Sequence, residues 1–245
     1  MRINVVNPNT TASMTAKIAA AAEAAATPGT EIIAVQPAEG PPSIEGYFDE
    51  ALSVPGLLNE IFAAERTGVD GHVIACFDDT GLDAARTIAQ APVVGIGEAA
   101  AHLATLVAGR FSVVTTLSRS IPALEHNLVR YGLASRCGRV RAAEVPVLEL
   151  EEPRSLARHR IAAEIEAALR DDRAEAIVLG CAGMADLAAA LSAEFGVPVV
   201  EGVSAAVRLI ESLAALGLRT SKIGGFAPPR AKAYSGPFAA LVAEA

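Results

Sequence analysis

Short apolar runs rich in Val and Ile alternate with longer segments rich in Ala, Leu and Glu along most of the chain. The apolar runs predict strands, at residues 3–6, 31–35, 72–75, 93–95, 111–115, 139–145, 176–179 and 197–200. The longer segments predict helices, at residues 14–26, 54–67, 82–90, 99–107, 120–131, 156–170, 184–195 and 205–216. Apolar strands separated by helices are typical of parallel sheets that are covered on both faces. This alternation therefore predicts an α/β fold.

The pattern occurs twice. Three pairs of similar positions are separated by 105, 106 and 108 residues, namely Cys76 and Cys181, Pro92 and Pro198, and Ile3 and Phe111. Two copies predict two similar lobes related by a pseudo-twofold axis, because a solenoid needs more repeats. We assign residues 1–100 and 208–245 to the first lobe and residues 101–207 to the second. Since ligands bind at the carboxyl ends of parallel strands, the active site is expected in the cleft between the lobes.

Cys76 and Cys181 occupy equivalent places in the two copies, each after an apolar strand and before a predicted helix. A helix N-terminus at that place would favour the thiolate form of the cysteine. The alternatives are that both residues are small apolar core residues, or that they form a disulfide. Cys137 has no counterpart in the repeat and is expected to be structural.

Two thiols that face each other across a cleft can act as an acid–base pair. One, as thiolate, removes a proton from a carbon acid, and the other, as thiol, returns a proton to the opposite face. The result is inversion at carbon without a cofactor. The enolate between these steps needs hydrogen-bond donors. Polar residues and backbone amides near the strand ends are candidates, with helix capping as the alternative role: Asn7, Asn9, Thr10, Phe77, Asp78, Thr115, Thr116, Ala182 and Gly183.

Six stretches, spread in order over nearly the whole chain, carry a family pattern: NPNTT (7–11), GPPSIEGY (40–47), ACFDDTGL (75–82), PVVGIGEA (92–99), FSVVTT (111–116) and LGCAGM (179–184). In these stretches the chain resembles the Asp/Glu/hydantoin racemase superfamily, and most closely its hydantoin and allantoin racemase branch. The resemblance implies two flavodoxin-like lobes with the site between them, a two-cysteine mechanism without a cofactor, and a homo-oligomer.

The same resemblance implies roles for individual residues. It makes Cys76 and Cys181 the catalytic pair and Ile44 part of a loop that shapes the pocket over the substituent. It implies substrate contacts at Asn9, Phe77, Asp78, Thr115, Thr116, Ala182 and Gly183. Thr80 stands where many relatives are expected to have proline, a difference expected to matter little. Arylmalonate decarboxylases resemble this fold but keep one cysteine, so two cysteines argue against decarboxylation.

The composition of the chain and the spacing of its motifs argue against several classes of partner and cofactor. A net charge of −8 without a basic run argues against nucleic acid and against anionic membrane surfaces. No signal peptide or transmembrane stretch is apparent, and three widely spaced cysteines make no disulfide framework, so a cytoplasmic location is expected. The motif G-x-G-x-x-A at residues 95–100 lacks the acidic residue of a dinucleotide site, and the histidines lack metal-ligand spacing. We therefore expect neither cofactor nor metal.

The sequence predicts a cofactor-independent racemase that acts on the carbon next to a carbonyl in a small cyclic ureide. A 5-substituted hydantoin is the first choice and allantoin the second. The alternatives are an amino-acid racemase of the Asp/Glu type, a cysteine-dependent lyase or decarboxylase, and a non-catalytic small-molecule binder. Carboxylates at Asp78 and Asp79 follow Cys76 closely, whereas no acid follows Cys181 until Asp186. Because nearby carboxylates raise a thiol pKa, Cys181 should ionise more readily in the free enzyme.

Overall fold

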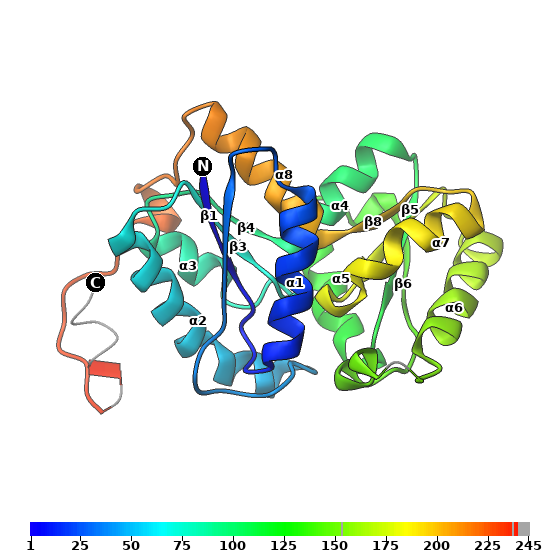
Figure 1. The fold of residues 1–245 in the computed structure, drawn as a ribbon, viewed down its shortest axis with the longest axis horizontal. Coiled ribbons are helices and arrows are strands. Elements are labelled where there is room, and N and C mark those ends of the chain that lie inside the picture. Colours follow the sequence, from blue (N-terminus) through cyan, green and yellow to red (C-terminus); the bar gives the residue numbers. More distant parts are fainter. Residues whose placement is uncertain (153, 237, 240–245) are drawn as a thin grey trace.

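Two four-stranded parallel sheets form the framework of the computed structural model, which describes residues 1–152, 154–236 and 238–239 (Figure 1). The first sheet has the strand order β2-β1-β3-β4, and the second has the order β6-β5-β7-β8. Each strand of one lobe therefore has a counterpart at the same place in the other lobe. The predicted α/β fold of two similar lobes with parallel sheets is confirmed.

The elements follow one another in the same sequence in both lobes. The first copy contains β1 Arg2–Val6, α1 Ala12–Ala25, β2 Glu31–Val35, α2 Tyr47–Thr67, β3 Gly71–Ile74, α3 Leu82–Ile88, β4 Val93–Gly95 and α4 Ile96–Val107. The second contains β5 Phe111–Thr115, α5 Ile121–Arg130, β6 Cys137–Ala142, α6 Ala157–Asp171, β7 Ala176–Gly180, α7 Ala188–Phe195, β8 Val199–Glu201 and α8 Gly202–Ala215.

The strands are apolar because both faces of each sheet are buried. In the first sheet Val5 pairs with Val73, and Val6 pairs with Ile74. Val5 and Val73 belong to the apolar cluster that includes α1 and α8, whereas Val6 and Ile74 belong to the cluster formed with α2 and α3. Successive residues of a strand point to opposite faces, so a strand buried on both sides is apolar at most positions. The buried polar residues Asn4 and His72 of these strands are hydrogen-bonded to each other.

Helices α4 and α8 are exchanged between the lobes. Helix α4 follows β4 of the first sheet but packs on β7 and β8 of the second, and α8 follows β8 but packs on β3 and β4 (Figure 1). The two helices also pack against each other at the middle of the molecule. The predicted lobe boundaries at 100/101 and 207/208 fall inside these two helices and stay a prediction. Residues 237 and 240–245 of the predicted first lobe lie outside the described residues.

One apolar cluster extends through both lobes. It joins Ile3 and Val5 of the first sheet to Phe111 and Val178 of the second, mainly through small residues of α4 and α8. Small residues are needed where the two helices meet: a Cβ added at Gly202 would lie 2.7 Å from Ile96 Cβ. The high alanine and glycine content of the chain thus serves close helix packing between the lobes.

Every predicted strand and helix is present among the described residues, but several predicted boundaries are wrong, and three of them have a clear cause. The strand predicted at 139–145 ends at Ala142, because Glu144 has a φ of 52°, which no strand residue adopts. The helix predicted at 54–67 begins at Tyr47 and contains Pro55. A proline is rare inside a helix because it lacks an N–H donor, yet here the helix continues on both sides of it. The helix predicted at 184–195 begins as a 3₁₀ helix, Ala182–Leu187, and becomes α-helical at Ala188.

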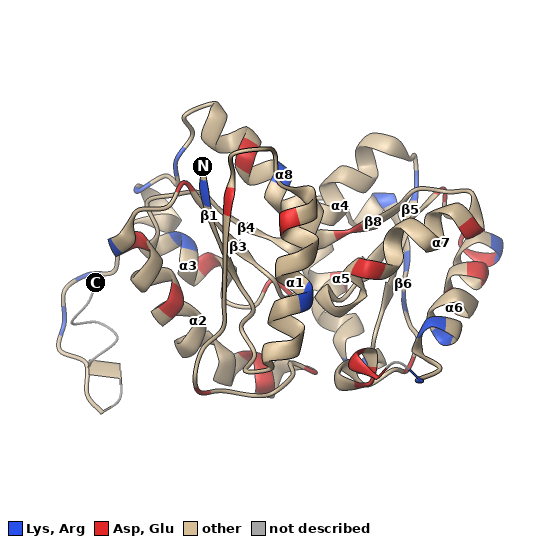
Figure 2. Cartoon of the chain, viewed as in Figure 1, with Lys and Arg blue, Asp and Glu red and all other residues tan. Residues whose placement is uncertain are grey.

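Charged residues of both signs are interspersed over the helices of both lobes (Figure 2). Such mixing is typical of an ordinary solvated surface and differs from the basic stripe of a nucleic-acid-binding protein. Within the described ranges, no helix combines the length and the apolar composition needed to cross a bilayer.

Candidate active site

A cavity lies where the carboxyl ends of β1 and β3 face those of β5 and β7. It encloses about 420 Å³ of space free of protein atoms, part of which is open to solvent. The predicted site residues that line it are Asn9, Ile44, Cys76, Phe77, Asp78, Thr115, Thr116, Cys181 and Ala182. Gly183 is not part of the lining but lies directly behind Cys181. The structure thus brings together residues from both copies of the repeat in one cavity between the lobes.

Cys76 lies two residues beyond the end of β3, in the turn that precedes α3. Its Sγ is 3.4 Å from Thr80 Oγ1. Burial raises the pKa of the Cys76 thiol well above 9.0, and the Asp78 carboxyl raises it further, whereas the Thr80 hydroxyl lowers it. Thr80, whose difference from proline is expected to matter little, therefore contacts the thiol directly.

Cys181 follows the last residue of β7 and begins the turn of the 3₁₀ helix Ala182–Leu187. Burial raises the pKa of its thiol to about 12, and the backbone N–H of Gly183, which donates to the sulfur, lowers it. The ammonium of Lys17 also lowers this pKa, whereas Asp78 raises it. The pKa of the Cys181 thiol is thus raised less than that of the Cys76 thiol, in the direction that the sequence predicts.

The expectation that a helix N-terminus favours the thiolate fits Cys181 better than Cys76. Cys181 is the N-cap of the 3₁₀ helix Ala182–Leu187, whereas α3 begins only at Leu82. Backbone N–H groups lower the pKa of both thiols, but burial has the larger effect and decides the direction of both shifts. Cys137 lies at the start of β6 and is not part of the cavity lining.

A pair of carboxyl groups, Asp78 and Glu50, lies beside Cys76. Asp78 Oδ2 and Glu50 Oε1 are both buried and accept no hydrogen bond from a described donor. Burial raises the pKa of Asp78 to about 8, helped by the neighbouring carboxyls of Glu50 and Asp79. The pKa of Glu50 is also raised by burial. A proton held on Asp78 satisfies both orphaned oxygens, because the side chains of the two residues form a hydrogen bond with each other.

Asp79 has a structural role that explains the glycine motif at residues 95–100. Its carboxylate accepts hydrogen bonds from the backbone N–H groups of Gly97, at 3.0 Å, and Glu98, at 2.7 Å, at the start of α4. The Tyr131 hydroxyl donates to the same group. A Cβ at Gly97 would lie 2.8 Å from Asp79 Oδ2, so glycine is needed for this approach. The motif therefore serves close packing around a buried carboxylate.

Asn9 is held by the loop between β1 and α1. Its Oδ1 accepts hydrogen bonds from the Thr11 backbone N–H at 2.9 Å and from Asn7 Nδ2 at 3.0 Å. Its Nδ2 lies 3.2 Å from Met14 Sδ on the cavity wall. Thr11, at the N-cap of α1, makes no side-chain cap. The Asn9 carbonyl thus closes a turn before α1 rather than capping the helix, whereas its NH₂ group is directed toward the cavity wall.

The two threonines at the end of β5 differ. Thr115 Oγ1 donates to the Gly180 carbonyl at 2.9 Å and so ties β5 to β7 just before Cys181. Its hydroxyl hydrogen is therefore engaged within the protein. Thr116 lines the cavity and is 4% exposed. Of the two, Thr116 is the better candidate donor to a ligand.

The loop at residues 40–46 covers the cavity and carries Ile44 into it. Its main chain is held by Thr10 N–H, which donates to Pro41 O at 3.0 Å, and by Thr11 Oγ1, which donates to Pro42 O at 2.6 Å. Glu45 reaches the other lobe, where its Oε1 accepts from the Val147 N–H at 2.9 Å. The loop thus spans both walls of the cleft.

Sequence reasoning missed the lining residues Met14, Ala75, Ser120, Val147 and Gly180. The repeat could have pointed to Ala75 and Gly180, which precede the two cysteines at equivalent positions. The other three come from elements with no local motif. Lys17 and Glu50, which act on the thiols electrostatically, were missed because helix spacing does not show which neighbouring element a helix faces.

The chain is similar to known proteins over nearly its whole length. The family model for Asp/Glu/Hydantoin racemase matches residues 3–210. The hydantoin racemase of Rhizobium meliloti is 50% identical over 236 residues, which are 96% of this chain and 98% of that protein. The solved allantoin racemase from Klebsiella pneumoniae is 55% identical, with a TM-score of 0.96 and 98% coverage of both chains. That of Pseudomonas fluorescens is 45% identical, with a TM-score of 0.93, 96% coverage of this chain and 100% of its own.

Proposed function

We propose that this chain, which belongs to the Asp/Glu/hydantoin racemase family and is a racemase, inverts C5 of 5-substituted hydantoins. The proposed mechanism is proton transfer by two cysteines. The observation that carries the proposal is the placement of Cys76 and Cys181. They follow equivalent strands of two similar lobes and line one cavity between them. A binding protein would not need a thiol at both positions.

The chemistry balances without an added reagent. The thiolate of one cysteine takes the C5 proton, whose acidity comes from the adjacent C4 carbonyl, and becomes a thiol. The electron pair of the broken C–H bond moves into an enolate. The second cysteine then delivers its thiol proton to the opposite face of C5 and becomes a thiolate. One turnover interchanges the protonation states of the two cysteines, and the reverse reaction restores them.

The enolate oxygen needs donors in the cavity wall. We propose this role for the NH₂ group of Asn9, the hydroxyl of Thr116 and backbone N–H groups of the Phe77–Asp78 and Ala182–Gly183 turns. Thr115 contributes by fixing the strand end rather than by donating, since its hydroxyl hydrogen is directed to Gly180. Donors fixed in place before the reaction stabilise developing charge at little reorganisation energy.

The charge of the cavity favours a neutral ring over an amino acid. Among the described residues that line it, none is Lys, Arg or His, and one is the acidic Asp78. An α-carboxylate in such a cavity would lack a cationic partner. A cyclic ureide needs only donors and acceptors for its N–H and C=O groups, which Asp78 and the backbone supply. Glutamate racemase of Francisella tularensis, 17% identical with a TM-score of 0.65, shares the fold alone.

Allantoin is the second candidate substrate, and it is itself a hydantoin with a ureido group at C5. The 55% identity to an allantoin racemase favours it. The apolar side chains of Met14, Ile44 and Val147 in the cavity wall instead favour an apolar substituent at C5. The polar ureido group would need partners such as Ser120 and Thr116. We therefore place apolar 5-substituted hydantoins first and test allantoin beside them.

The test is proton NMR in deuterated water with enantiopure 5-isobutylhydantoin and allantoin, offered separately. We expect enzyme-dependent loss of the C5 proton signal together with loss of optical activity. Cys76→Ser and Cys181→Ser should each abolish racemisation, because one face of C5 then has no cysteine to remove or return a proton. Cys137→Ser is the matched control and should leave the rate unchanged.

Each outcome decides something. Deuterium exchange without inversion in one single-cysteine variant would show which enantiomer the remaining cysteine deprotonates. Full racemisation by either variant would overturn the two-cysteine mechanism. No exchange on either ureide by the intact enzyme would overturn the substrate class, and free amino acids would then be compared. The spontaneous racemisation rate is subtracted throughout.

We also propose that the chain works as a homo-oligomer in a reducing, cytoplasmic compartment. The apolar side chains of Tyr47, Phe48 and Leu52 on the first turns of α2 are 61%, 76% and 53% exposed, which favours burial against another chain. All three cysteines are free, and the proposed mechanism requires two of them to stay reduced. Light scattering of the purified protein measures the subunit number.

A further inference from the structure

Lys17 connects the first lobe to the loops behind Cys181. It is the one basic residue of α1, and its side chain is 23% exposed. Its Nζ donates to the carbonyl of Leu150 at 3.1 Å and to that of Gly183 at 3.4 Å. It also lies 3.1 Å from Glu151 Oε1. A flexible lysine held by three groups of the opposite lobe is more constrained than a surface lysine.

Gly183 lies between Lys17 and the thiol. Its carbonyl accepts from Lys17, and its N–H donates to the sulfur of Cys181. These two groups belong to successive peptide units that meet at the Gly183 Cα, so Lys17 restrains the residue that supplies the N–H. A Cβ at Gly183 would lie 3.6 Å from Cys181 Sγ and 3.0 Å from Leu150 Cδ1, so this residue is closely packed against both.

The charged groups that face Cys181 shift the pKa of its thiol in opposite directions. Lys17 lowers the pKa of the thiol, whereas Asp78 and Glu151 raise it. Around Cys76 the charged neighbours are the carboxyls of Asp78 and Glu50, and both raise its pKa. Among the described charged groups with the largest effects on the two thiols, the one cation is Lys17, and it acts on Cys181.

We propose that Lys17 is a positioning residue for Cys181, which holds Gly183 beside the sulfur and makes this cysteine the more readily ionised of the two. The proposal rests on the two-cysteine function and names which of two chemically identical groups ionises more readily. Lys17 does not line the cavity, so it acts through Gly183 and through its charge.

The test measures the thiol itself and needs no substrate. In a background with Cys76→Ala and Cys137→Ala, Cys181 is the single thiol, and its alkylation rate by iodoacetamide between pH 8 and 10 reports its thiolate fraction. Lys17→Met should lower that rate by roughly three- to tenfold at each pH, as expected for loss of a nearby opposite charge. Lys17→Arg should retain most of the rate, because it keeps the charge.

Two further variants separate this role from a structural one. Lys222 also donates to two main-chain carbonyls, of Arg86 at 2.7 Å and Thr87 at 3.3 Å, but away from the cavity. Lys222→Met is therefore the matched control and should leave the alkylation rate unchanged. Glu151→Gln should raise the rate, because it removes a charge that opposes ionisation and leaves the Lys17 carbonyl contacts in place.

An unchanged rate in Lys17→Met, with a native circular dichroism spectrum, would overturn the proposal. A Glu151→Gln rate that falls as far as that of Lys17→Met would also overturn it, because loop disorder would then explain both. If Lys17→Met does not fold, Glu151→Gln and Lys17→Arg still decide the sign of the charge effect. Failure of ureide exchange in the intact enzyme is a separate result, since alkylation involves no substrate.

A kinetic measurement complements the thiol measurement. The two enantiomers have equal free energy, so kcat/KM must remain equal in both directions in any variant. A difference between the two enantiomers in Lys17→Met can therefore appear only in kcat and KM taken separately. For both enantiomers we expect kcat/KM to fall, and we expect its increase with pH to move to higher pH. Lys222→Met should leave this pH profile unchanged.

Discussion

At the scale of single residues, the cavity wall contains the carboxyl group of Asp78, which burial keeps protonated over a wide pH range. Asp78 has a pKa of about 8, raised from 3.8 by burial and by Glu50 and Asp79. Between these two pH values the folded chain retains a proton that the unfolded chain has lost. Stability must therefore fall as the pH rises from about 4 to about 8, and this loss is complete above the folded pKa. The site thus carries a destabilising group that serves its chemistry.

Replacing Asp78 by Asn should remove this pH dependence. We expect the melting temperature of Asp78→Asn to exceed that of the parent by an amount that grows from pH 4 to pH 8 and is constant above. A thermal melt in a buffer series from pH 4 to pH 9 measures it. Asp186→Asn, at an exposed position in the second lobe, is the control. A difference that does not vary with pH would contradict the prediction.

Residue identity could be predicted at the site only where the repeat or the family pattern marks it. Cys76 and Cys181 are visible because two copies of one pattern retain the same residue. Glu50 and Lys17 are not visible, because they come from helices whose partners depend on tertiary packing. Thr80 was expected to matter little, yet its hydroxyl contacts the Cys76 thiol. Side-chain direction in a turn cannot be deduced from spacing.

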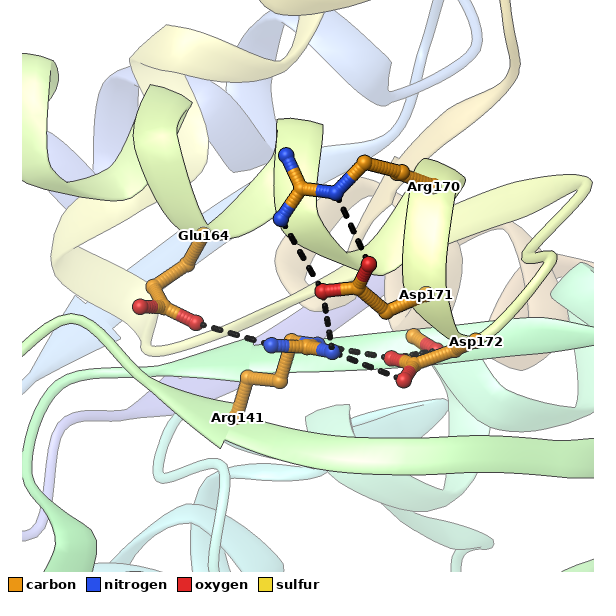
Figure 3. Close-up of polar contacts among 6 residues, drawn as sticks. Arg141, Glu164, Arg170, Asp171 and Asp172 are labelled. Carbon is orange, nitrogen blue, oxygen red and sulfur yellow. Dashed lines mark hydrogen bonds and ion pairs between the residues drawn. The ribbon is translucent and has the colours of Figure 1, made fainter.

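At the scale of elements, the edge strand β6 is fixed to the lobe by a charged cluster (Figure 3). Arg141 of β6 donates from Nε to Asp172 Oδ2 at 2.7 Å and from Nη2 to Asp172 Oδ1 at 2.8 Å, and Glu164 lies 3.4 Å away. The side chains of Arg141 and Asp172 are 11% and 7% exposed. The Ser112 hydroxyl of β5 donates to the same carboxylate. A bidentate pair thus joins the strand to the end of α6.

Arg141→Met should lower the free energy of unfolding by about 2 kcal/mol, because it leaves the mostly buried Asp172 carboxylate without its cation. Racemase activity per folded molecule should be unchanged, since Arg141 does not line the cavity. Urea titration followed by circular dichroism measures the first quantity. Arg170→Met, which removes a solvent-exposed partner of Asp171, is the control and should have little effect. Equal losses in the two variants would refute the role of the bidentate pair.

Elements were more predictable than their ends. The strands were found because burial on both faces requires continuous apolar runs. The end of β6 was missed because nothing in the sequence around Glu144 signals its positive φ, which an ordinary side chain rarely adopts. The start of α2 was missed because Pro55 looks like a first helical residue when read alone.

At the scale of the whole molecule, the two lobes share one apolar cluster and exchange α4 and α8. Neither sheet is covered on both faces without a helix that follows the other sheet. We therefore expect one cooperative unfolding transition, with equal calorimetric and van't Hoff enthalpies. Gly202→Ala places a methyl group against Ile96 where the helices meet, and should lower the midpoint without splitting the transition. Two resolved transitions in the calorimeter would contradict this prediction.

The exchange of α4 and α8 also bears on ancestry. A chain of half this length, ending after α4, would leave one face of its sheet open. It could close that face only by trading the helix with an identical copy. Joining two such copies end to end would preserve every contact and add only a connection. In the present chain the two halves differ around their thiols, with a lysine behind Cys181 and two acids beside Cys76.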